Sequence, residues 1–142
     1  MATSTMARTG KRASIVGMAA AAVVGALAMP AQASSWSSSL TNVGNDFESR
    51  RWTDNGGSTT IDFTTCKRDS SASQAVTVTL RKDTFGPDPK YSTQTYTNCF
   101  KYSGATSSGS WDDHGSGDYY FVVDYGQNVY APVSVNSLTV YY

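Results

Sequence analysis

Apolar and polar positions alternate through most of the chain after residue 33. The alternation is clearest over 75–82, where Val76, Val78 and Leu80 are separated by Thr77 and Thr79. Successive side chains of a strand point to opposite faces, so the three apolar residues predict one buried face. No segment in this part of the sequence has the 3.6-residue apolar period of a helix. The pattern therefore predicts a domain built from strands.

A hairpin is predicted from two neighbouring segments, 46–53 and 58–66. The four residues between them, 54–57, read Asp-Asn-Gly-Gly. Asn-Gly and Gly-Gly supply the positive φ angles that a tight hairpin turn requires. In the second segment Ile61 and Phe63 share the phase expected to be buried, and Trp52 is expected to pack across the hairpin.

Three further strands are predicted over 94–102, 118–125 and 131–142. The segment 118–125 is almost continuously apolar (DYYFVVDY), which is typical of a central strand. In 131–142 the apolar phase slips near residues 136–137, as it does at a β-bulge. The segments 85–89, with one glycine and two prolines, and 104–117, rich in glycine and serine, are predicted as loops.

At least six strands joined by short turns predict an all-β fold, an antiparallel two-sheet β-sandwich, with a small β-barrel as the alternative. The sandwich is expected to occupy residues 34–142 as a single domain. Its first residues, 34–40, read SSWSSSL and are expected to be a flexible arm or the lead-in to a first strand.

The first 33 residues have the three parts of a secretory signal peptide. Arg8, Lys11 and Arg12 form a basic start, 15–29 is an apolar run, and 31–33 reads Ala-Gln-Ala. A permanent membrane anchor needs about 20 apolar residues, and this run is shorter. We therefore expect cleavage after residue 33 and a secreted, extracellular protein.

Charge is distributed unevenly along the chain. Three of the 11 basic residues lie in the predicted signal, so eight remain against 11 acidic residues in the mature part. A net negative domain is a poor partner for nucleic acid or an anionic membrane, which attract clusters of lysine and arginine. We expect neither partner once the signal is removed.

Cys66 and Cys99 are the two cysteines of the chain, and both lie in the part expected to be exported. An even number of cysteines in an oxidising compartment predicts a disulfide. The alternatives are a metal site or a reactive thiol. Two cysteines 33 positions apart, without a C-x-x-C motif or a nearby histidine, make a poor metal site.

Candidate chemistry is sparse, and no catalytic residue, metal ligand or cofactor is assigned. The loop Asp112-Asp113-His114 contains the chain's one histidine and could contribute oxygen ligands to Ca²⁺, but its spacing does not match an EF-hand. Its aspartates could equally shape turns. No G-x-S-x-G motif surrounds a serine nucleophile. We therefore expect a protein that is not an enzyme.

Aromatic residues are the strongest functional signal, because all nine tyrosines follow residue 33. Adjacent tyrosines in one strand point to opposite faces, so some must lie on a surface. Trp111, in the long polar loop, Tyr120, in the phase of Asp124, and Tyr130, beside a turn, are the predicted binding residues. Exposed rings could stack on a sugar or contact a protein.

Two classes of partner follow from these observations. The first is a polysaccharide or cell-surface glycan, bound by a non-enzymatic secreted binding module through exposed aromatic rings. The second is a secreted protein, bound by a protein-interaction protein such as a protease inhibitor or effector. The segment 85–90, with its two prolines, is the candidate for a rigid loop of the second kind.

The layout resembles that of small secreted two-cysteine β-domain proteins of Streptomyces and related actinobacteria. The residues that carry the resemblance are the alanine-rich signal ending at 31–33, the segments 49–54 (SRRWTD) and 58–61 (STTI), the two cysteines, and the C-terminal 135–142 (VNSLTVYY). The resemblance implies no activity.

Overall fold

The computed structural model describes residues 33–126 and 131–142. Nine strands and one short 3-10 helix make up this part of the chain. They are β1 (Ser35–Val43), β2 (Phe47–Glu48), β3 (Trp52–Asp54), β4 (Thr59–Lys67), β5 (Val76–Asp83), β6 (Lys90–Tyr96), η1 (Asn98–Phe100), β7 (Thr106–Trp111), β8 (Gly117–Asp124) and β9 (Val133–Tyr141).

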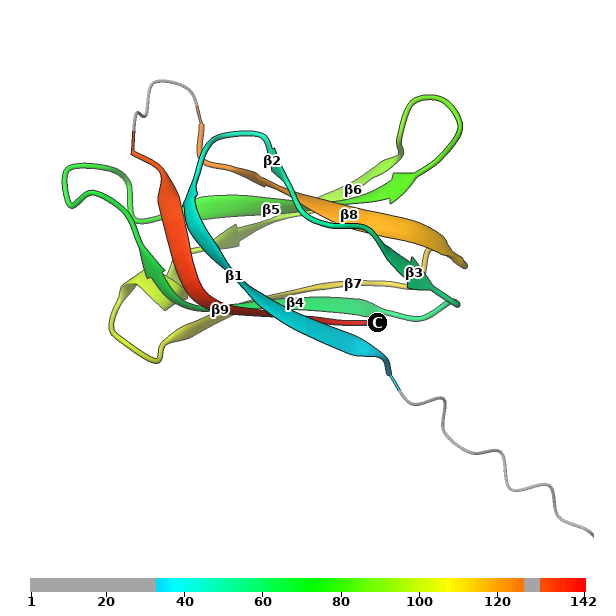
Figure 1. The fold of residues 1–142 in the computed structure, drawn as a ribbon, viewed down its shortest axis with the longest axis horizontal. Helices are drawn as coiled ribbons and strands as arrows, with labels where there is room; N and C mark the ends of the chain where they lie inside the picture. Colours follow the sequence, from blue (N-terminus) through cyan, green and yellow to red (C-terminus); the bar gives the residue numbers. More distant parts are fainter. Residues whose placement is uncertain (1–32, 127–130) are drawn as a thin grey trace, which may run out of the picture. The chain divides into compact units, whose positions relative to one another are not determined.

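The strands form two antiparallel sheets that pack face to face (Figure 1). One sheet has the order β1-β9-β4-β7, and the other has the order β2-β8-β5-β6, with β3 also paired to β8. The sheets do not close into a barrel. The predicted β-sandwich is therefore confirmed.

The core lies between the sheets and is built by alternation. Val76, Val78 and Leu80 of β5 are buried, as predicted, and Phe121 of β8 faces them from the neighbouring strand. The rings of Phe63 and Phe121 meet across the two sheets with centroids 5.8 Å apart. Strand β8 lies between β5 and the β2 and β3 strands, which confirms its predicted central position.

The predicted bulge in the last strand is confirmed. Ser38 of β1 pairs with Leu138 of β9, but Leu40 pairs with Val135, so β9 has one extra residue at 136–137. The extra residue returns Val135 and Leu138 to the same buried face. The pairing also shows that the stretch 34–40 is not a flexible arm, because Ser35–Val43 is strand β1.

The predicted hairpin of 46–53 with 58–66 is wrong. Strand β3 pairs with β8, whereas β4 pairs with β7 and β9, so residues 55–58 carry the chain from one sheet to the other. The turn itself forms: Gly56 has φ +104° and its N–H donates to the Asp54 carboxylate. The Asn-Gly signal located a turn correctly, but it does not specify which strands pair on either side.

The predicted loop 104–117 contains a strand, β7, that the hydrophobic pattern does not reveal. Its buried positions are Ser107, Gly109 and Trp111, and two of these are small. Gly109 is small because the ring of Tyr96 from the other sheet fills the space opposite it, and the hydroxyl of Ser107 accepts the backbone N–H of Cys99. The predicted strand 94–102 is wrong in its bounds, because β6 spans Lys90–Tyr96 and the 3-10 helix η1 follows it.

Cys66 of β4 and Cys99 of η1 form a disulfide with an S–S distance of 2.03 Å, which confirms the predicted pairing. Both cysteines are buried. The bond fixes the connection between β6 and β7 against the four-stranded sheet.

Candidate functional site

The structure does not expose the predicted binding rings that it describes. Trp111 is 3% exposed and Tyr120 is 2% exposed, and Tyr130 lies outside the described residues. The expectation that Trp111 and Tyr120 lie on the surface is therefore wrong. Trp111 is buried because it belongs to the inward phase of β7, where its indole N–H donates to the carbonyl of Ser92.

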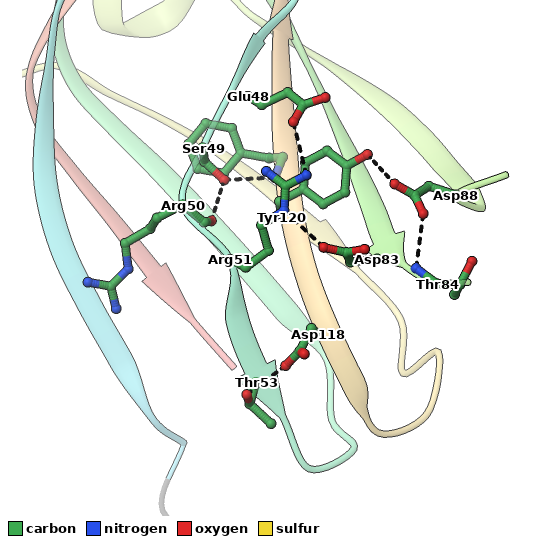
Figure 2. A network of polar contacts seen from close by, with 11 residues as sticks. Glu48, Ser49, Arg50, Arg51, Thr53, Asp83, Thr84, Asp88, Asp118 and Tyr120 are labelled. Carbon is green, nitrogen blue, oxygen red and sulfur yellow. Dashed lines mark hydrogen bonds and ion pairs between the residues drawn. The ribbon is translucent and has the colours of Figure 1, made fainter. Parts of the chain in front are cut away.

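Tyr120 lies on the outer face of its sheet, as its phase predicted, but other side chains cover it. The guanidinium of Arg51 lies 4.0 Å from the centre of the Tyr120 ring. The Tyr120 hydroxyl donates to Asp88 over 2.7 Å. The ring therefore supports the loop that contains Asp88, as Figure 2 shows.

That loop, between β5 and β6, presents the most exposed large apolar side chain among the described residues. Phe85 is fully exposed, whereas most other aromatic rings in this part of the chain pack on the core. The neighbouring Gly86 has φ +120°, a conformation that residues with a Cβ rarely adopt. The chain therefore reverses beside Phe85 and leaves its ring without intramolecular contacts that would bury it.

Four hydrogen bonds fix the base of this loop. The N–H of Thr84 donates to Asp88 over 2.9 Å, and the Thr84 hydroxyl donates to the carbonyl of Pro87. The N–H of Lys82 donates to the carbonyl of Pro89. The fourth bond is that of the Tyr120 hydroxyl to Asp88. Asp88 thus connects the two sides of the loop to the outer face of the sheet.

Arg51 connects the same face to two further carboxylates. Its guanidinium lies 3.0 Å from Glu48 and 3.0 Å from Asp83, and Figure 2 shows it between them beside the Tyr120 ring. These groups are substantially exposed, so each ion pair contributes little to stability by itself. Their effect is positional, because together they hold the guanidinium over Tyr120.

The pKa values of these groups agree with this arrangement. The N–H of Thr84 and then the hydroxyl of Tyr120 lower the pKa of Asp88 below its usual value. Burial, followed by the hydrogen bond to Asp88, raises the pKa of Tyr120. The hydrogen bond to Asp83 is the largest cause of the raised pKa of Arg51. At neutral pH Asp88 is a charged acceptor and Tyr120 a neutral donor.

The loop between β7 and β8 lies at the same end of the sandwich (Figure 1). The ring of His114 stacks on Tyr91 of β6 with centroids 3.6 Å apart, and the carbonyl of His114 accepts a hydrogen bond from Lys82. Asp113 accepts the N–H of Gly115 over 2.7 Å. Asp113 thus shapes a turn, which is one of the two roles considered from the sequence.

Among the described residues, no group of three or more histidine, cysteine, aspartate or glutamate side chains is placed to hold a metal ion. The hydroxyl of Tyr119 contacts the β7–β8 loop, because it donates a hydrogen bond to the carbonyl of Gly115. Burial, followed by the nearby carboxylates of Asp54 and Asp113, raises the pKa of Tyr119. The hydroxyl therefore stays protonated and keeps the β7–β8 loop on the sheet.

Besides Phe85, two large apolar side chains are exposed among the described residues. Tyr102 follows η1 and is 67% exposed, and Tyr141 on β9 is 42% exposed. The β6–β7 connection that contains Tyr102 lies at the opposite end of β6 from the loop with Phe85. Phe85 and Tyr102 therefore do not belong to one flat platform.

Comparison of the chain with protein-family models, curated proteins and solved structures found no match. The resemblance to secreted actinobacterial proteins stays a prediction. Within residues 33–126 and 131–142, no helix has the length and apolar character needed to cross a bilayer.

Sequence reasoning found the segment 85–90 as a candidate interaction loop but missed what holds it. The signal for the loop was Gly86 between Phe85 and Pro87. The support comes from Tyr120 and Arg51, which lie far from the loop in sequence. Tyr120 reaches the loop through the pairing of β5 with β8, and Arg51 through the pairing of β2 and β3 with β8, and no local pattern encodes these pairings.

Proposed function

We propose that this chain is a secreted, non-enzymatic binding protein that binds a partner protein through the β5–β6 loop, with Phe85 as the anchor. The observation that carries the proposal is a fully exposed Phe85 on a loop fixed by four hydrogen bonds. Aromatic residues are enriched in protein interfaces and account for much of their binding energy.

The loop is suited to binding because it is already ordered. Burying a phenylalanine ring in a partner's pocket is worth about 1.5–3 kcal/mol. A mobile loop would lose part of that gain when it became ordered on binding. Asp88 and Thr84 bridge the base of the loop in the free protein, so little of this cost remains. A single exposed ring can then act as an anchor.

The backbone around Phe85 favours insertion into a pocket over imitation of a protease substrate. A substrate-like inhibitor lies extended along the enzyme and pairs with it through backbone hydrogen bonds. Gly86 has φ +120°, which reverses the chain, and Pro87 has no N–H to donate. Of the protein-interaction roles considered from the sequence, the geometry therefore supports an effector better than a substrate-like inhibitor.

A glycan-binding role has less support. Polysaccharide recognition through stacking requires exposed rings on one face. Trp111 and Tyr120 are buried, and Phe85 and Tyr102 lie at opposite ends of the sandwich. Phenylalanine also lacks the polar group with which tyrosine and tryptophan bind sugar hydroxyls. We therefore favour a protein partner over a polysaccharide.

Secretion is part of the proposal and rests on two observations. The first 33 residues have the composition of a signal peptide, and Cys66 and Cys99 form a disulfide, a bond that persists in oxidising compartments. N-terminal sequencing of protein collected from the culture medium is expected to begin at Ser34. Recovery of the protein only inside the cells, with the first 33 residues attached, would contradict export.

Photo-crosslinking tests the interaction surface. The photoreactive amino acid benzoylphenylalanine replaces Phe85 in one variant and Tyr102 in a matched control, because both side chains are exposed and they lie at opposite ends. The variants are illuminated with extracellular proteins from cells that produce the chain. Crosslinking of one protein by the Phe85 variant alone supports the proposal. Equal crosslinking at both positions, or at neither, contradicts it.

A further inference from the structure

The two open edges of the sandwich differ. On one side β6 and β7 approach so closely that a Cβ on Gly109 would lie 2.6 Å from the hydroxyl of Tyr96. On the other side, where β1 and β2 are the edge strands, a groove of about 140 Å³ remains between the sheets. The groove is separate from the β5–β6 loop and plays no part in the function proposed above.

The groove exists because a small residue occupies an inward position of β1. Ser38 pairs with Leu138, and its neighbours in the same phase, Trp36 and Leu40, are large. A serine here leaves unfilled the volume that a leucine would occupy. Across the groove Ser49 is also small, and its hydroxyl accepts the backbone N–H of Phe121.

The walls of the groove are largely apolar. The indole of Trp36 stacks on Phe121 with an interplanar angle of 7° and centroids 6.4 Å apart. Leu40, Phe47 and Leu138 contribute the remaining apolar surface. A hydrocarbon chain or ring would therefore gain contacts on both sheets.

A cation lies at the rim. The guanidinium of Arg50 lies 4.5 Å from the centre of the Trp36 ring, and Figure 2 shows Arg50 and Arg51 pointing to opposite sides of their segment. Arg51 pairs with two carboxylates, whereas Arg50 pairs with none in the described part of the chain. The indole N–H of Trp36 also has no acceptor there, although it is buried.

We propose that this groove binds a small apolar carboxylic acid, with its hydrocarbon part between Trp36 and Leu138 and its carboxylate on Arg50. The volume fits roughly six carbon atoms, since an engineered apolar cavity of about 150 Å³ binds benzene. Arginine binds carboxylates through paired, charge-assisted hydrogen bonds. Charge complementarity between Arg50 and an acid thus selects the ligand among apolar molecules of this size.

Titration with sodium hexanoate, followed by the indole N–H signals in ¹H–¹⁵N spectra, tests the site. The oxidised protein is expected to bind hexanoate with a Kd of about 0.1–1 mM. The Trp36 signal should shift, whereas that of Trp111 should not, because Trp111 lies on the far edge strand β7. Hexanol should bind about tenfold more weakly. No shift of Trp36 with millimolar hexanoate would overturn the proposal.

Two variants and one matched control separate the parts of the site. Ser38→Leu fills the groove and should abolish the Trp36 shift, whereas Ser37→Leu, on the outer face of the same strand, should leave it unchanged. Arg50→Gln should weaken hexanoate binding about tenfold and leave hexanol binding as it is. Equal binding of hexanoate to the parent and to Arg50→Gln would overturn the placement of the carboxylate on Arg50. An unchanged Trp36 shift in Ser38→Leu would overturn the placement of the hydrocarbon part in the groove.

Discussion

Gly109→Ala tests how the sandwich closes along β6 and β7. An added Cβ would lie 2.6 Å from the Tyr96 hydroxyl, 2.9 Å from its ring and 3.0 Å from the side chain of Gln94. Tyr96 cannot move aside easily, because it is 1% exposed, its ring contacts Phe63 edge-on, and its hydroxyl donates to the carbonyl of Ile61 in the other sheet. The substitution must therefore displace the ring or separate the strands.

The expected cost follows from these contacts. Overpacking a well-packed core by one methyl group costs about 1–3 kcal/mol. Displacing the Tyr96 hydroxyl also breaks an inter-sheet hydrogen bond worth about 0.5–1.5 kcal/mol. Together they predict that Gly109→Ala lowers the free energy of unfolding by about 2–4 kcal/mol. The gain in β-propensity of alanine over glycine is smaller and does not reverse the sign.

Urea unfolding of the oxidised protein measures this effect in a double-mutant cycle with Tyr96→Phe. Removing the hydroxyl removes the closest contact, so Gly109→Ala should cost at least about 1 kcal/mol less in the Tyr96→Phe background. Gly44→Ala is the matched control, because a Cβ there meets nothing within 4 Å, and it should change stability by less than about 0.5 kcal/mol. A neutral Gly109→Ala, or strictly additive costs, would refute the packing argument.

Three further predictions concern the disulfide and the support of the loop. Replacing both Cys66 and Cys99 by alanine frees a loop of about 34 residues and should lower the free energy of unfolding by about 4 kcal/mol, measured by urea unfolding; a loss below about 1 kcal/mol would contradict it. Because hydrogen bonds lower the folded-state pKa of Asp88, their contribution is complete above its unfolded pKa of about 4 and is lost as the pH falls through the folded value. The amide signal of Thr84 should therefore titrate with a midpoint below 3.8, and a midpoint above 4 would count against the bond. Tyr120→Phe should speed amide exchange at Thr84 while β4 amides stay protected, and unchanged exchange would show that the hydroxyl does not support the loop.

Strands with large apolar residues on their inward face could be predicted from the sequence. Val76, Val78 and Leu80 identify β5, and the phase slip between Val135 and Leu138 locates the bulge of β9. Alternation is a local property of one strand, so it can be recognised without knowing which strands pair with it. The disulfide was predictable for a similar reason, since two cysteines allow one pairing.

Strands whose inward positions are small could not be predicted. In β7 the buried Ser107 and Gly109 give no hydrophobic pattern, because the Ser107 hydroxyl accepts the N–H of Cys99 and Tyr96 from the other sheet fills the space at Gly109. Strand pairing could not be predicted from the sequence either. The turn before β4 is compatible both with a hairpin and with a connection that passes from one sheet to the other. Both failures involve contacts between residues far apart in the chain.

Only part of the candidate site could be predicted, because the rest depends on contacts between residues far apart in the chain. Phase analysis placed Tyr120 on the outer face of β8, which is correct, but exposure depends on what covers that face. Arg51 and Asp88 reach it from two other segments and bury the ring. The loop of Phe85 was predictable from its glycine and prolines, whereas its order depends on Tyr120.

The central claim is that Phe85 anchors a protein partner. Its most direct test is the affinity of the crosslinked partner, once purified, for Phe85→Ala and for Tyr102→Ala, with thermal unfolding measured for both. An anchor residue is worth at least about 2 kcal/mol, so Phe85→Ala should weaken binding about 30-fold or more without lowering the Tm. Tyr102→Ala should change the affinity by less than about twofold. A Phe85→Ala variant that binds as tightly as the parent would contradict the account.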